Sequence, residues 1–255
     1  MKKLILVALT ATALIGVTSS ANAESMLLQE NDFVGITFWL VSMSLLAATT
    51  FFFFERNTVA PIWRTSITVA GLVTGVAFVH YLYMRGIWVN TGETPTVYRY
   101  IDWLITMPLL TIEFYLILTV VKKVPRSMFW RLLTASLIML IGRYMGESNM
   151  ISAGFGFFIG VVAWIYIIYE IFSGQTAKAA SGSGNKSVKT AFAAMRMIVT
   201  VGWAIYPLGY VFGYLTGDVD ANSLNVIYNA ADFLNKIAFG LIIWAAAMSS
   251  SGRVR

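Results

Sequence analysis

The chain has 255 residues, of which 58% are hydrophobic and only 12% charged, and its formal net charge is +6. Soluble domains carry roughly 25% charged residues, so this composition predicts a membrane protein. There is no cysteine and only one histidine, which excludes a disulfide framework and a Cys- or His-rich metal centre. The basic residues lie between apolar runs, as membrane topology requires, and this placement argues against nucleic-acid binding.

The first 23 residues have the pattern of a secretory signal. Lys2 and Lys3 precede an apolar run over 4–17, and residues 21–23 form an Ala-x-Ala cleavage site. We therefore predict a cleavable signal peptide over 1–23 and a mature membrane domain over 24–255. An uncleaved additional helix is the alternative interpretation.

Seven further segments are long and apolar enough for transmembrane helices, which need about 20 mainly apolar residues. They are too continuous for the strands of a membrane barrel, which alternate over about ten residues. The predicted fold is therefore an all-α bundle of seven transmembrane helices, of which the fourth is the shortest and weakest. The predicted spans are 33–54, 61–84, 97–121, 129–145, 151–172, 190–215 and 224–248.

The loop charges predict the orientation of this bundle. Lysines and arginines concentrate in the first, third and fifth connections and in the C-terminal tail, whereas the intervening loops hold few. Positive loops face the cytoplasm, so the N-terminus is expected outside and the C-terminus inside, in agreement with a cleaved signal. The fifth connection, SGQTAKAASGSGNKS, is rich in Gly, Ser and Ala and predicts a flexible loop.

The third span carries two acids on one face. Asp102 and Glu113 are eleven residues apart, which places them about 20° apart around the helix and about 16 Å apart along it. Thr106 and Arg99 lie near the same face. A charge at a helix centre costs roughly 2.5–3.5 kcal/mol on insertion scales, so these residues indicate either a functional relay or a structural ion pair.

The seventh span carries a lysine near its middle. Asp232 and Lys236 are four residues apart and therefore share a face. Lys236 is about 12 residues from either end of the predicted helix, or about 18 Å, too far for its side chain to reach water. This lysine must be paired, neutral or covalently modified. A Schiff base and a structural Lys–Asp pair both remain open.

Aromatic residues concentrate in the same spans. Trp103 follows Asp102, and the run GWAIYPLGY contains Trp203, Tyr206 and Pro207. These side chains could enclose a flat apolar ligand or could form an ordinary core.

Three segments, RYIDWLITMPLLTIEFY, GWAIYPLGY and IYNAADFLNKIAFGLIIW, resemble the microbial rhodopsins, and most closely the proteorhodopsins, and the resemblance covers nearly the whole mature chain. The resemblance implies a light-driven outward proton pump of the bacterial inner membrane, and therefore a transporter and not an enzyme. It implies all-trans retinal bound to Lys236 as a protonated Schiff base, Asp102 as counterion and proton acceptor, and Glu113 as cytoplasmic proton donor. Asp232 is then the second counterion, Arg99 shapes the field outside it, and Thr106 completes the Asp-Thr-Glu pattern of proton pumps.

The same resemblance assigns further residues. His80 matches the histidine that interacts with the counterion and would weaken pumping in acid by favouring protonated Asp102. Leu110 matches the colour-tuning position, where leucine is found in green-absorbing members. Gly154 resembles the side opening through which xanthorhodopsin-type pumps admit a carotenoid antenna, although close helix packing is an alternative, and Gly156 takes its place if the register differs. The retinal pocket would include Trp103, Met139, Trp203, Tyr206 and Pro207.

Two interpretations compete with a pump. A sensory rhodopsin that signals through a transducer shares the fold, but Glu113 argues against it because sensors commonly lack a carboxyl donor. A retinal-free transporter is disfavoured by Lys236 and the aromatic residues. Arg143 and Glu147 are four residues apart and are expected to form a local pair. By resemblance the protein would form rings of five or six copies.

Overall fold

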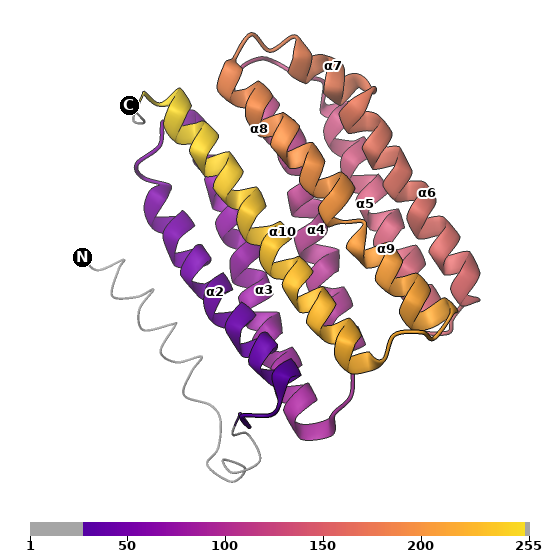
Figure 1. Cartoon of the computed structure of the whole chain (residues 1–255). Coiled ribbons are helices and arrows are strands. Elements are labelled where there is room, and N and C mark those ends of the chain that lie inside the picture. The colour runs from indigo at the N-terminus through magenta and orange to yellow at the C-terminus, as the bar shows by residue number, and fades with distance from the viewer. Residues whose placement is uncertain (1–27, 253–255) are drawn as a thin grey trace.

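The computed structural model describes residues 28–252, which form an elongated bundle of helices (Figure 1). The predicted signal peptide, 1–23, lies outside the described residues. Each of the seven predicted spans corresponds to one helical segment of the bundle. Five spans are single α-helices, namely α2 (Phe33–Glu55), α4 (Thr96–Thr119), α5 (Arg126–Glu147), α6 (Ala153–Phe172) and α10 (Ala221–Ser250).

The second span begins with a short 3₁₀ turn, η3 (Pro61–Trp63), and continues as α3 (Arg64–Thr91), seven residues beyond the predicted end at Met84. It stops at Gly92, whose φ of 68° is the left-handed conformation that ends many helices. The predicted span ended too early because Arg85 was expected to lie in a loop, whereas the helix continues past Arg85.

Six of the seven described spans are long and apolar enough to cross a membrane. The exception is α5, which carries Arg126, Arg131, Arg143 and Glu147 within 22 residues. It nevertheless packs between α4 and α6 as a full member of the bundle. The chain is therefore a multi-pass membrane protein whose fourth span, as predicted, has the weakest apolar character.

The sixth span is irregular in the middle. It runs through α8 (Lys186–Met197), the π-helical turn η4 (Ile198–Gly202), α9 (Ile205–Tyr210) and a second π-helical turn, η5 (Val211–Leu215). Pro207 has no N–H to donate to the carbonyl of Trp203, so a regular ladder cannot continue through this point. The widened turns rotate the aromatic side chains of this span relative to an ideal helix.

The connection over 173–187 was predicted to be flexible, and this prediction is wrong for its first half. Residues Gln175–Ser181 form a short helix, α7, with Thr176, Ala179 and Ala180 buried. Alanine is the strongest helix former, and burial of one face of α7 stabilises the turn further.

The arrangement places α4 and α10 where the functional residues can meet. Helix α4 packs against α3, α5, α8 and α10, while α10 also packs against α2 and α3. In Figure 1, α2 begins at one end of the bundle and α10 finishes at the other. Seven passes therefore put the start of α2 and the end of α10 on opposite sides of the bundle; which side is cytoplasmic stays a prediction from the loop charges.

Candidate functional site: a buried lysine, two acids and an aromatic cavity

Lys236 lies in the middle of α10 and is completely buried. Its Nζ donates a hydrogen bond to Asp102 on α4 and another, of 3.1 Å, to Asp232 one turn earlier on α10. The side chains of both acids are also completely buried. The structure thus brings together the lysine and the two acids that the sequence placed on separate helices.

The two acids differ in their other contacts. Asp232 accepts hydrogen bonds from the hydroxyls of Tyr206 (2.6 Å) and Tyr81 (2.9 Å), and the Trp103 indole Nε1 lies 3.2 Å from both its oxygens. Asp102 is bound only by Lys236, and its Oδ1 is buried without a partner. Asp232 is therefore held as an acceptor among donors, whereas Asp102 keeps one oxygen open. The contribution of Tyr81 was not foreseen from the sequence.

Arg99 does not form an ion pair with either acid. Its guanidinium donates to Asn225 Oδ1 (2.8 Å) and Asn229 Oδ1 (3.3 Å). Sequence reasoning missed both asparagines, although residues 225, 229, 232 and 236 recur at the spacing of one helix face. The Thr106 hydroxyl bonds to the backbone carbonyl of Asp102 (2.9 Å), so it contacts the helix and not the carboxylate.

Glu113 lies apart from the ion-pair cluster. Its side chain is buried on α4 without an ion pair among the described residues, and the hydroxyl of Ser66 on α3 is its hydrogen-bonding neighbour. An ionised carboxylate without a cation beside it is very costly inside apolar protein, and this cost favours the protonated form. Glu113 lies about 16 Å along the helix from Asp102.

His80 is half-buried on α3, with Nδ1 2.9 Å from the carbonyl oxygen of Val76. A carbonyl can only accept, so Nδ1 carries the proton of this bond and Nε2 of a neutral ring is left as an acceptor. Within residues 28–252 no hydrogen bond joins His80 to Asp102. The predicted interaction between the two therefore stays a prediction.

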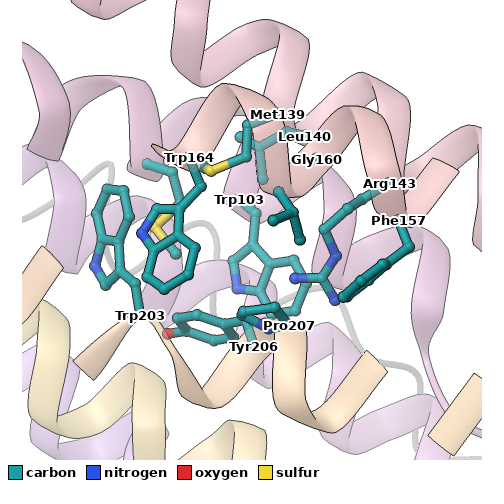
Figure 2. A pocket seen from close by; sticks show the side chains of 12 residues that line it. Trp103, Met139, Leu140, Arg143, Phe157, Gly160, Trp164, Trp203, Tyr206 and Pro207 are labelled. Carbon is teal, nitrogen blue, oxygen red and sulfur yellow. The ribbon is translucent and has the colours of Figure 1, made fainter. Parts of the chain in front are cut away.

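An aromatic cavity adjoins the ion-pair cluster (Figure 2). All five predicted pocket residues, from Trp103 to Pro207, line it. Trp103 and Tyr206 also bond to Asp232, so the cavity adjoins an acid that bonds to Lys236. The cavity is narrow, with a volume of about 30 Å³. Its complete lining is Trp103, Met107, Met139, Leu140, Arg143, Phe157, Gly160, Val161, Trp164, Trp203, Tyr206 and Pro207.

Sequence reasoning missed the contribution of α6 to this wall. Phe157, Gly160, Val161 and Trp164 follow the spacing of one helix face, a signal that was available in the sequence. Trp164 Nε1 donates to the carbonyl of Val199 in the π-helical turn (3.0 Å), which fixes its ring at the cavity.

Two predicted residues do not line the cavity. Leu110 is buried in the surrounding core. Gly154 lies exposed on α6, and a Cβ added there would meet no atom within 4 Å. The side opening at Gly154 stays a prediction, since Gly154 faces open space and the cavity lining on α6 begins at Phe157. Gly156, the alternative, faces the backbone of α5.

The residues present fit an elongated apolar ligand that reacts with an amine. The wall is mainly aromatic and aliphatic, and Lys236 supplies a buried primary amine beyond Trp103 and Tyr206. The buried Nε1 of Trp203 and Oδ1 of Asp102 have no partners, which leaves polar groups for such a ligand to satisfy.

Comparison with known proteins decides the family. The sequence profile of the bacteriorhodopsin-like proteins matches residues 32–250. The chain belongs to the bacteriorhodopsin-like family. Among curated members, the green-light absorbing proteorhodopsin of Gamma-proteobacterium EBAC31A08 is 53% identical over 225 residues, covering 88% of this chain and 90% of the relative. The blue-light absorbing proteorhodopsin of Gamma-proteobacterium Hot 75m4 is 54% identical over 223 residues, covering 87% and 88%.

Solved structures of this family have the same fold. The crystal structure of blue light-absorbing proteorhodopsin from Med12 is 54% identical, with a TM-score of 0.75, and the match covers 86% of this chain and 100% of that one. Xanthorhodopsin, a light-driven ion pump with a dual chromophore, is 25% identical, with a TM-score of 0.73 and coverage of 86% and 94%. This member of the bacteriorhodopsin-like family thus groups with proteorhodopsins, as its motifs predicted.

Proposed function

We propose that this protein is a light-driven outward proton pump of the bacterial inner membrane, with all-trans retinal bound to Lys236 as a protonated Schiff base. One observation carries the proposal: Lys236 Nζ bonds to two buried acids, one of which also bonds to Trp103 and Tyr206 of the cavity wall, while a third buried carboxyl, Glu113, lies farther along α4. The identity of 53–54% to proteorhodopsins supports the same conclusion.

Retinal bound at Lys236 would supply light absorption and an isomerisation that changes the proton affinity and orientation of the imine nitrogen. Asp102 receives the proton, since its Oδ1 is open and its carboxyl already contacts the nitrogen. Asp232 keeps its negative charge throughout, because Tyr81, Tyr206 and Trp103 donate to it.

Glu113 returns a proton to the nitrogen from the other side. The predicted topology places Asp102 in the outer half of α4 and Glu113 in the cytoplasmic half, so net transport is outward. Export against the membrane potential costs roughly 2.3 kcal/mol per charge per 100 mV. Arg99, on the outer side of Asp232 and bound by two asparagines, holds a positive charge there that favours ionised acids.

Three further assignments belong to the proposal. Leu110 sets green absorption from its place in the core beside the cavity. His80 interacts with Asp102 and favours its protonated form, so pumping weakens in acid. The protein assembles into rings of five or six copies through its lipid-facing surfaces.

A sensory rhodopsin has less support. Sensory rhodopsin-2 of Natronomonas pharaonis is 28% identical over 227 residues, far below the proteorhodopsins. The buried carboxyl of Glu113 serves proton return, which a sensor does not need.

Illumination of cells that express the protein and are fed retinal tests the proposal. We expect the external medium to acidify in the light, and a protonophore to abolish the change. The Lys236→Ala variant should give neither colour nor acidification. Alkalinisation that persists, or colour retained by Lys236→Ala, would reject the proposal.

A further inference from the structure

Arg143 is a charged residue in the wall of an otherwise apolar cavity (Figure 2). No step of the proposed proton transport uses Arg143. Its side chain is buried on α5, and its Nη2 forms a 3.2 Å ion pair with Glu147, one turn later. The local pair expected from the sequence is thus present, but its cation faces the cavity.

The guanidinium lies on the side of Tyr206 opposite its hydroxyl oxygen, which bonds to Asp232, an acid partner of Lys236 (Figure 2). It pairs with Glu147, interacts with the hydroxyl of Tyr228 and contacts the rings of Trp103 and Tyr210, with Cζ 5.6 Å and 5.1 Å from the two ring centroids. None of these groups bonds to Lys236.

The charge of Arg143 is only partly compensated where it meets the cavity. Arg143 lines the cavity, whereas Glu147 lies behind it and also accepts a hydrogen bond from Tyr100. The buried Nε of Arg143 has no partner. A dipole with its positive end toward an apolar space acts strongly there, because the surrounding dielectric constant is low.

We propose that Arg143 is a colour-tuning residue, whose guanidinium shifts absorption to shorter wavelength by facing the cavity on the side of Tyr206 away from Asp232, the acid partner of Lys236. The inference rests on the proposed function, since it requires a chromophore linked to Lys236. When a protonated imine conjugated to a polyene absorbs light, positive charge moves from the nitrogen toward the other end of the chain. A fixed cation at that end raises the energy of the excited state more than that of the ground state.

The ion pair gives two variants with opposite expected shifts. Arg143→Met removes the cation and keeps an elongated side chain, so the absorption maximum of the retinal-loaded protein should move to longer wavelength. Glu147→Gln removes the compensating anion and leaves the cation, so the maximum should move to shorter wavelength. Arg143→Lys, which keeps the charge, should lie closer to the parent protein than Arg143→Met does.

Arg131→Met is the matched control. Arg131 lies on the same helix and is also ion-paired, to Glu170 at 3.3 Å, but it does not line the cavity. Its loss should leave the absorption maximum unchanged. If Arg143→Met does not fold, the direction in which Glu147→Gln shifts the absorption maximum still tests the tuning role of Arg143.

The outcomes separate the two proposals. If the parent protein stays colourless with retinal, the proposed function fails. If it is coloured but neither Arg143→Met nor Glu147→Gln shifts the maximum, or both shift it in the same direction, the tuning role of Arg143 is overturned while the pump proposal stands.

Discussion

The two acids beside Lys236 are chemically identical side chains in unequal surroundings. Three side chains besides the lysine donate to Asp232, whereas Lys236 alone donates to Asp102. Residue identity gave no means to separate them, since both are aspartates within reach of one cation. For the proposed pump, these hydrogen bonds predict that Asp232 keeps its charge and that Asp102 takes the proton.

Asp102→Asn therefore tests the acceptor. An amide cannot receive the proton, so light-driven acidification should fall roughly 10²-fold or more while the protein still binds retinal. Asp220→Asn is the control, because Asp220 is an exposed N-cap of α10 and asparagine caps as well as aspartate. Normal pumping by Asp102→Asn would contradict the assignment.

Glu113→Gln tests the donor. Without a stored proton, the recovery of the parent absorption after a flash should slow by about 10²-fold, and a small membrane-permeant weak acid should restore it. Thermal stability should change little, since Glu113 forms no ion pair among the described residues and glutamine can still accept a hydrogen bond from Ser66. A recovery as fast as that of the parent protein would exclude Glu113 as the donor.

At the scale of elements, α5 and α6 approach each other through glycines. A Cβ added to Gly156 would lie 2.7 Å from the Cα of Gly146 and 2.8 Å from the carbonyl oxygen of Gly142. Both neighbours are backbone atoms and cannot move aside. Close contact at small residues is how membrane helices associate, and here it also joins two walls of the cavity.

Gly156→Ala should therefore destabilise the protein by about 1–3 kcal/mol, because the two helices must separate. Gly154→Ala is the matched control two residues away, where a Cβ meets no atom within 4 Å and alanine favours the helix by about 1 kcal/mol. The midpoint temperature at which each purified variant loses its colour on heating measures the stability of the two variants. Equal midpoints for the two variants would show that the α5–α6 contact is not tight at Gly156.

The irregular sixth span shows where prediction from local sequence stopped. Pro207 indicated a disturbance, but it did not indicate two π-helical turns or the bond from Trp164 to the carbonyl of Val199. Those features depend on packing between α6 and the sixth span, since a carbonyl freed from the helix ladder needs a partner from another element. The helix α7 was missed for a similar reason, because its burial is tertiary.

At the scale of the whole molecule, the direction of transport depends on the orientation of the bundle in the membrane. The chain contains no cysteine, so single cysteines can report orientation without background. Ser181→Cys, exposed at the end of α7, should react with a membrane-impermeant thiol reagent only in permeabilised cells. Asp218→Cys, before α10, should react once the outer membrane alone is opened. The reverse pattern would invert the proposed direction.

The sequence by itself determined the number of spans, the expected orientation and the residue types of the site. Apolar length, loop charge and helical spacing are local properties, so Lys236, Asp102 and Glu113 could be singled out before any contact was known. Only the tertiary structure decided which groups meet: that Asp232 is saturated and Asp102 open, that Arg99 binds asparagines, that Gly154 faces outward and that Arg143 faces the cavity. These outcomes depend on rotation and packing of helices distant in sequence, and a difference of one residue on a helix turns a side chain by about 100°.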